Sequence, residues 1–359
     1  MTISDDVYRI LDANLNRARE ALRVIEDHAR FILDDAAAAE RVKRLRHELR
    51  GVVAELGAER LLCARDIVND VGRETKTPAE LRRESTGDVL HAAFARLTEA
   101  ARVLGEYGKL ISAPAAAVAE HVRYESYELH QVLALRGDLR KRFRDVRLYV
   151  LITEALCRDG WFETAAGAIR GGAGCLQLRE KTLSDAELLR RAKLLRTLTT
   201  DAGALLFIND RPDIAKLCGA DGVHVGQDDL PVSAARRGAG PDILVGKSTH
   251  TPEQFAAALA ENPDYLAVGP MFDSSTKPQG HIAGLETLAT VAGRMTLPLV
   301  AIGGITADNV TDVVRAGAAC VCVCSAVSGA ADPEAAAARL LAAIKQTREQ
   351  CDPPRDPER

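Results

Sequence analysis

Charged and amide side chains of the kind that bind phosphate gather at one place in the second half of the chain. The segment Gln177-Leu178-Arg179-Glu180-Lys181 follows a short apolar run. In an extended backbone alternate side chains share a side, so Gln177, Arg179 and Lys181 face the same space. One amide and two cations facing together are suited to phosphate, and above all to diphosphate. The alternative is a surface charge run that pairs with Glu180.

Two aspartates that follow the next two apolar runs suggest a magnesium site. Asp210 comes at the end of one run and Asp229 at the end of the next. On neighbouring strands the two carboxylates would suit Mg²⁺, which prefers oxygen ligands and shares them with substrate phosphates. Either aspartate could instead cap the following helix, and Asp228 is expected to do so. His224 is expected to be a packed histidine, with a ligand or base as the alternative.

A second set of residues suited to anions comes later in the chain. Three hydroxyls and an ammonium group are adjacent at Ser274, Ser275, Thr276 and Lys277. The turn at Gly303-Gly304 and the turn at Cys324-Ser325 each follow an apolar run, and glycines let backbone N–H groups approach an anion. Two anion-binding areas with Lys277 between them predict two phosphorylated substrates, one of which carries a metal-bound diphosphate.

The elements that must position these residues are eight short strands that alternate with helices. The predicted strands are 147–153, 175–178, 205–209, 222–225, 244–248, 265–268, 299–302 and 320–324, separated by helical stretches such as 184–200, 252–260, 283–293 and 307–316. Eight βα units in roughly 200 residues predict an α/β fold, a (β/α)₈ TIM barrel, with the site at the carboxyl ends of the strands. A doubly wound sheet is disfavoured, because no G-x-G-x-x-G follows the first strand.

The chain before the barrel has a helical pattern throughout. Within it, RAREALRVIED (17–27) and RLTEAARVLGE (96–106) are similar, with identical residues at five equivalent positions. Two copies of one helical unit could pack about a pseudo-twofold axis, although Ala/Arg/Glu-rich helices also resemble one another by chance. We therefore expect an all-α domain at 1–143, the barrel at 144–350 and a flexible tail at 351–359.

Composition limits the class of protein. The formal net charge of −4 gives no reason to expect nucleic-acid binding, and no signal peptide or membrane span is recognisable. The eight cysteines include no C-x-x-C pair, and Cys320, Cys322 and Cys324 alternate as a buried row of thiols would. A cytoplasmic protein is expected, whose oligomeric state stays open, a homo-oligomer included.

Six ordered motifs resemble the thiamine-phosphate synthase family, over about residues 147 to 345. They are Q-L-R-E-K, I-N-D-R, G-V-H-V-G-Q-D-D, G-K-S-T-H, G-P-x-F-x-S-x-T-K and A-I-G-G-I. The resemblance implies an Mg²⁺-dependent transferase of thiamine biosynthesis. Such an enzyme joins 4-amino-2-methyl-5-(diphosphooxymethyl)pyrimidine to 4-methyl-5-(2-phosphooxyethyl)thiazole and releases diphosphate. A thiazole tautomerase on a similar barrel, or an inactive barrel that serves the helical domain, are the alternatives.

The resemblance also implies a role for each candidate residue. The pyrimidine diphosphate would be bound by residues 177–181, Asn209, Ser248 and Lys277, with Mg²⁺ held by Asp210 and Asp229. The thiazole phosphate would be bound by residues 274–276, Gly304 and the Cys324-Ser325 turn. Catalysis would depend on Lys277, Arg179, Lys181 and Ser248. One departure is Asp273-Ser274, where the family usually has Pro-Thr, and Asp273 places negative charge near a phosphate.

The helical part resembles a small family described as hydroxymethylpyrimidine-phosphate kinases, through I-L-D-A-N-x-N-R-A-R-E-A-L-R-V-I-E-D at 10–27. Such an activity would make the diphosphate that the barrel consumes. The candidate residues are Asn14, Asn16, Arg17, Arg19, Glu20, Arg23, Glu26 and the segment 69–73. A docking or oligomerisation module is the alternative, because no Walker A motif or protein-kinase glycine loop is present.

Overall fold

The computed structural model describes residues 4–33, 35–66, 82–273, 282–293, 295 and 297–351. The chain divides into two compact units, Met1–Gly137 and Asp138–Arg359. The first unit is helical and the second contains every strand of the described residues. No helix in these residue ranges is long and apolar enough to cross a membrane.

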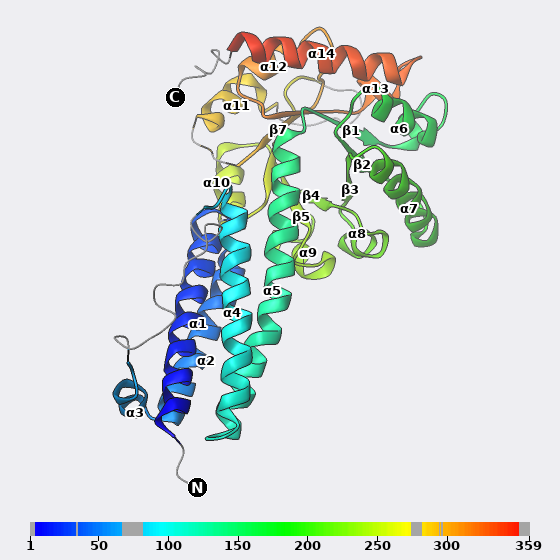
Figure 1. Ribbon diagram of the computed structural model, residues 1–359. Coiled ribbons are helices and arrows are strands. Elements are labelled where there is room, and N and C mark those ends of the chain that lie inside the picture. The colour runs from blue at the N-terminus through cyan, green and yellow to red at the C-terminus, as the bar shows by residue number, and fades with distance from the viewer. Residues whose placement is uncertain are drawn as a thin grey trace. The chain divides into compact units, whose positions relative to one another are not determined.

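The first unit is built from long amphipathic helices (Figure 1). They are α1 (Asp5–Phe31), α2 (Ala36–Leu56), α3 (Ala58–Cys63), α4 (Thr86–Gly108) and α5 (Ala113–Asp145), of which α5 continues into the second unit. Side chains of Ser4, Asp35 and Ser85 accept hydrogen bonds from the first turns of α1, α2 and α4. Such caps satisfy backbone donors that have no partner inside the helix.

The two similar segments of the sequence lie on α1 and α4, and these two helices pack against each other. Burial is the same at most equivalent positions: for example, Ala18 and Leu97 are buried, as are Ala21 and Ala100. The charged pairs that share a residue type, at 17 and 96, 20 and 99, and 23 and 102, are exposed. Both segments therefore present the same apolar face to the helical core and the same charged face outward.

The second unit is a closed barrel of eight parallel strands in sequence order. The strands are β1 (Leu148–Ile152), β2 (Cys175–Leu178), β3 (Leu205–Asn209), β4 (Gly222–Val225), β5 (Leu244–Thr249), β6 (Tyr265–Val268), β7 (Leu299–Ile302) and β8 (Cys320–Val323). Between and after them come a 3₁₀ turn (Glu154–Leu156) and α6 (Trp161–Arg170), α7 (Asp185–Asp201), α8 (Pro212–Cys218), α9 (Val232–Ala239), α10 (Pro252–Ala260), α11 (Gly284–Ala292), α12 (Val310–Arg315), α13 (Ser325–Ser328) and α14 (Pro333–Cys351).

The predicted barrel is confirmed, and the doubly wound sheet is excluded. Each of the eight strands lies where the alternation of apolar runs and helices placed it, with ends that differ by at most one residue. The strand pairing closes through β1 and β8, where Tyr149 is in register with Cys322. Cys351, the first residue of the predicted tail, is the last residue of α14, and residues 352–359 lie outside the described part.

Aromatic side chains fill the barrel interior because glycines lie beside them on neighbouring strands. Phe207 is paired with Gly222 and Tyr265 with Gly246. A Cβ atom added at Gly246 would lie 2.0 Å from Cζ of Tyr265, and one at Gly222 would lie 2.2 Å from Cε1 of Phe207. Phe143, which precedes β1, stacks on Tyr265 with 4.5 Å between ring centroids. Gly246 is thus required for the position of Tyr265, and Gly222 for that of Phe207.

Replacing Gly246 by alanine is expected to destabilise the barrel by about 1–3 kcal/mol, the usual cost of overpacking a core. Urea unfolding followed by the fluorescence of Trp161 measures this, because that residue is the chain's one tryptophan and lies in α6. Gly293→Ala is the control: Gly293 has a φ of −66°, and its nearest neighbour would lie 4.0 Å away. Equal midpoints for the two variants would contradict the packing argument.

Candidate active site

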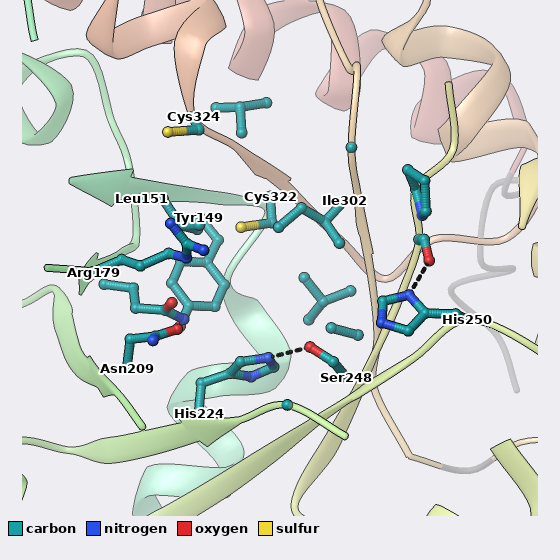
Figure 2. A pocket seen from close by; sticks show the side chains of 18 of the residues that line it. Tyr149, Leu151, Arg179, Asn209, His224, Ser248, His250, Ile302, Cys322 and Cys324 are labelled. Carbon is teal, nitrogen blue, oxygen red and sulfur yellow. Dashed lines mark hydrogen bonds between the residues drawn. The ribbon is translucent and has the colours of Figure 1, made fainter. Parts of the chain in front are cut away.

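A cavity of about 440 Å³ opens at the carboxyl ends of the strands. Every one of the eight strands, or the loop that follows it, contributes residues to its lining. The cavity falls in the size range of small-molecule sites, and in barrels of this kind the active site lies at this end. Figure 2 shows side chains of β1, β3 to β5, β7 and β8 around this space, together with Arg179, which follows β2.

The predicted anion cluster after β2 lies in this cavity. Gln177, Arg179 and Lys181 all line it, as the alternation of side chains predicted. Lys181 Nζ lies 3.3 Å from Asp210 Oδ2. The Arg179 guanidinium lies at the wall of the cavity, as Figure 2 shows. It has no ion-pair partner among the described residues. A cation in this state is available to an anionic ligand.

The other two residues of that segment point elsewhere. Leu178 is buried in the core between the strands and the surrounding helices. Glu180 accepts a hydrogen bond of 2.7 Å from the backbone N–H of Glu154, and its carboxylate lies 3.7 Å from Arg191. Neither side chain lines the cavity, and Glu180 does not pair with the cations on either side of it, so a simple surface charge run is excluded.

The two predicted metal ligands come together. Their carboxyl groups are within hydrogen-bonding reach of each other. Burial and the adjacent Asp229 raise the pKa of Asp210. Burial also opposes ionisation of Asp229, but hydrogen bonds from Asp210 and from the Gly226 amide (2.8 Å) outweigh it and lower that pKa. Each of the two carboxyl groups therefore influences the ionisation of the other.

The backbone supports this placement of the aspartates. Asp210 has a φ of +60°, in the left-handed region that residues other than glycine seldom adopt. Its N–H donates to the carbonyl of His224 at 2.8 Å. Neither Asp210 nor Asp228 caps a helix: α8 and α9 follow Arg211 and Pro231, without side-chain caps. The expectation that Asp228 caps the next helix was wrong, because three residues separate it from α9, and Asp228 lines the cavity instead.

A chain of hydrogen bonds crosses the cavity floor. Gln177 Nε2 donates to the Tyr149 hydroxyl at 2.7 Å, and that hydroxyl lies 3.3 Å from the Tyr265 hydroxyl. The Tyr265 hydroxyl is 2.8 Å from His224 Nδ1, and His224 Nε2 is 2.8 Å from Ser248 Oγ. Figure 2 shows the last of these contacts as a dashed line. Five strands thus contribute to one polar chain.

The chain has a consistent direction of donation. Burial lowers the pKa of His224 to about 4, so its imidazole is neutral and has one donor and one acceptor nitrogen. If Tyr149 donates to Tyr265 and Tyr265 donates to Nδ1, then Nε2–H donates to Ser248. The hydroxyl proton of Ser248 is then free for a ligand in the cavity. His224 is therefore the packed, hydrogen-bonded histidine that the sequence favoured.

The predicted second anion area contributes to the same cavity. Gly304, Cys324 and Ser325 line it, together with Gly303. Gly304 has a φ of +66°, and a Cβ added there would lie 2.6 Å from the carbonyl oxygen of Asp273, so only glycine fits. Ser274, Ser275, Thr276 and Lys277 lie outside the described residues, as does the segment 69–73 of the helical unit.

The cysteine row is a structural feature of the interior. Cys320 and Cys322 are buried inside the barrel, with Cys324 packed against the same cluster. Burial raises the pKa of Cys320 to about 12 and that of Cys324 to about 11. Both thiols are protonated at neutral pH, which makes them poor nucleophiles.

Several residues of the cavity were not predicted. Tyr149, Tyr265 and Ala267 lie on inward positions within strands, while His250 and Gln254 follow β5. The alternation of side chains along each strand was the available signal for the tyrosines. The prediction used only the residues at strand ends, and so it missed the floor of the cavity.

Comparisons with known proteins agree with this geometry. The model of the family described as thiamine monophosphate synthase matches residues 148–327, and that of the ThiD2 family matches residues 9–132. The chain is 41% identical over 338 residues to a thiamine-phosphate synthase of Thermosynechococcus vestitus, covering 94% of this chain and 95% of the relative. It is 40% identical over 334 residues to that of Rhodopirellula baltica, covering 90% and 89%.

A solved structure is similar to the barrel. It is a thiamine phosphate pyrophosphorylase from Pyrococcus furiosus, 33% identical, with a TM-score of 0.54, and the match covers 58% of this chain and 98% of that one. The relatives in the sequence comparison are matched along both units of the chain, whereas this structure corresponds in length to one of them. The fold and the cavity of this chain, together with these relatives, show that the chain belongs to the thiamine-phosphate synthase family.

Proposed function

We propose that the barrel joins 4-amino-2-methyl-5-(diphosphooxymethyl)pyrimidine to 4-methyl-5-(2-phosphooxyethyl)thiazole, giving thiamine phosphate and diphosphate. The observation that carries this proposal is one cavity lined both by Gln177, Arg179 and Lys181 and by the Gly303-Gly304 and Cys324-Ser325 turns. Two phosphorylated substrates require two such areas around one reaction centre. The eight free cysteines, with no disulfide among the described residues, fit a reducing cytoplasm.

The reaction is alkyl transfer. The C–O bond between the pyrimidine methylene and the diphosphate breaks, and its electron pair leaves with the diphosphate. The electron-rich aminopyrimidine stabilises the cation that results, and the thiazole nitrogen then supplies the electron pair of the new C–N bond. Arg179 and Lys181 neutralise the charge that develops on the leaving group. Lys277 is assigned the same role, and Gln177, Asn209 and Ser248 orient the pyrimidine ring.

Asp210 and Asp229 fit a site for Mg²⁺. Two facing carboxylates repel each other unless a proton or a cation lies between them, and burial together with the neighbouring Asp229 raises the pKa of Asp210. No group of three or more acidic, His or Cys side chains that could hold a metal occurs in the described residues. Asp210 and Asp229 would hold the ion together with diphosphate oxygens and water, which are usual ligands of Mg²⁺. A bound ion would supply positive charge that helps to neutralise the leaving diphosphate.

The function is tested by measuring diphosphate release from the two substrates with the full chain. Release that requires both substrates and Mg²⁺ is expected. Release from the pyrimidine diphosphate alone at an equal rate, with water as acceptor, would contradict the proposal. So would conversion of a thiazole phosphate isomer without any diphosphate, which is what a tautomerase would catalyse.

Tyr265→Phe is expected to lower kcat by up to roughly tenfold, the effect of losing one or two buried neutral hydrogen bonds. The substitution keeps the ring that stacks on Phe143 but removes the hydroxyl between Tyr149 and His224. Ser248→Ala should lower kcat at least as much, and Tyr149→Phe should lower it less. The reason is that Ser248 is the member of the hydrogen-bond chain that contacts the ligand, and Tyr149 is farther from it. Steady-state diphosphate release measures kcat and KM, and the reverse order would contradict the role of the hydrogen-bond chain.

For the helical unit we propose phosphorylation of the pyrimidine monophosphate, which would supply the barrel. The observation that favours it is a pair of cavities that share Glu20. One, of about 300 Å³, is lined by Arg19, Arg23, Arg46 and Arg50. Arg23 pairs with Asp27 and Arg46 with Glu26, but four guanidinium groups in one cavity remain suited to a polyphosphate. An oxygen of the monophosphate would form a bond to the γ-phosphorus of ATP while the bond between that phosphorus and ADP breaks. ATP-dependent formation of the pyrimidine diphosphate by the full chain tests this, and its absence favours a docking module.

A further inference from the structure

The second cavity of that pair has the features of a ligand site built from both similar segments. It has a volume of about 740 Å³ and lies between α1 and α4. Its lining includes four positions of each segment, which correspond pair by pair: Arg17 with Arg96, Glu20 with Glu99, Ala21 with Ala100, and Val24 with Val103. We call this cavity the α1/α4 groove.

The floor of the groove is made of short side chains. Ala21, Ala93 and Ala100 are buried there. Val24 is 39% exposed although it is apolar, and Val89 is exposed to the same degree. Short residues on two packed helices leave an open apolar slot, which suits a flat ring.

The charges along the groove are available to a ligand. Arg17, Glu20, Arg96 and Glu99 have no ion-pair partner among the described residues. Nearby charges on the same two helices do pair, such as Arg23 with Asp27 and Arg102 with Glu106. Two guanidinium groups, one from each helix, suit a phosphate, and two carboxylates accept hydrogen bonds from amino groups.

We propose that the α1/α4 groove binds the phosphate monoester of a small amino-substituted heteroaromatic ring. The phosphate lies on Arg17 and Arg96, the ring on the alanine floor, and the ring amino group on Glu20 or Glu99. Both segments contribute one cation and one carboxylate, so the site exists only where the two copies face each other. The identity of the ligand rests on the phosphorylation activity proposed above, whereas the location rests on the groove and its paired residues.

The test is calorimetric titration of the full chain with 4-amino-5-hydroxymethyl-2-methylpyrimidine phosphate. The barrel could also bind this compound, so the titration uses a chain with Arg179→Ala and Lys181→Ala. In that background we expect one binding site. Arg17→Ala and Arg96→Ala should each raise its Kd by about tenfold to a hundredfold, the effect of one hydrogen-bonded charge.

The control is Arg44→Ala, which removes an exposed arginine of α2 that lines neither cavity and should leave Kd unchanged. Circular dichroism checks that each variant is folded. If an alanine variant is not folded, Arg17→Lys or Arg96→Lys replaces it, and the loss of affinity should then be smaller but similar for the two positions. If the chain with only Arg179→Ala and Lys181→Ala binds no ligand at all, the proposal is overturned. A Kd that responds to only one of the two arginines would do the same.

The outcomes for binding and for catalysis are separable. Binding that depends on both arginines, without ATP-dependent phosphorylation, would overturn the proposed activity and support the groove. Phosphorylation that continues unchanged in both arginine variants would overturn the groove and leave the activity in place.

Discussion

Replacing Arg179 by alanine is expected to lower the kcat for thiamine phosphate formation by about 10²–10³-fold, the cost of removing one preorganised donor from a developing charge. That factor corresponds to about 2.7–4 kcal/mol of transition-state stabilisation. Arg179 lines the cavity and has no ion-pair partner among the residues that the structure describes. The protein therefore does not already neutralise its charge, and the whole positive charge can interact with the departing diphosphate.

The measurement is single-turnover formation of thiamine phosphate at saturating substrates, which separates the chemical step from binding. Arg237→Ala serves as the control, because it removes an exposed charge of α9 that does not line the cavity. Arg179→Lys should recover part of the rate, since it keeps the charge but not the paired N–H geometry. A rate for Arg179→Ala within twofold of the control, on the order of RT in free energy, would rule out the assigned role.

The fold was predictable because barrels repeat one local pattern. Each strand is short and apolar, each connection is a helix, and the eight repeats occupy the whole of the second unit. The main components of the site followed from the same regularity. Asp210 follows β3 and Asp229 lies in the loop after β4, and parallel strands bring such loops to one edge of the sheet. Their approach therefore required no knowledge of side-chain packing.

What could not be predicted depends on contacts between distant strands. Tyr149 and Tyr265 are 116 residues apart in sequence, and their hydroxyl contact exists only because the barrel closes and Gly246 leaves room for Tyr265. Glu180 shows the converse, because residues that are neighbours in the sequence need not contact each other. It stands between two cations in the sequence, yet it contacts Glu154 and Arg191, which belong to other elements. Pair contacts of this kind are set by tertiary packing.

The similar segments of the helical unit show how sequence and structure combine. The sequence left chance similarity as an explanation for the match between residues 17–27 and 96–106. Equal burial at most equivalent positions, on two helices that pack together, favours a true structural repeat. The groove that follows from it involves Arg96 and Glu99, which the resemblance of residues 10–27 to a kinase family had not singled out.

Asp229→Asn is expected to raise the Mg²⁺ concentration for half-maximal rate by more than about tenfold, because a neutral amide is a weaker ligand than a carboxylate for a hard cation. Asparagine keeps an oxygen that can accept the hydrogen bond from the Gly226 amide, so the turn should stay folded. Removing the charge also removes the repulsion by which Asp229 helps to raise the pKa of Asp210, whereas burial, the largest cause, remains.

The matched control is Asp228→Asn, which removes one charge from the lining of the same cavity at the neighbouring position. Its Mg²⁺ requirement should be nearly unchanged, since Asp228 is not part of the carboxylate pair. Diphosphate release measured across a Mg²⁺ titration compares the two variants with the parent chain. If both shift the titration equally, the effect comes from the net charge of the cavity, and the assignment of Asp229 as a ligand fails. A shift confined to Asp229→Asn instead requires a cation held between the two strand ends.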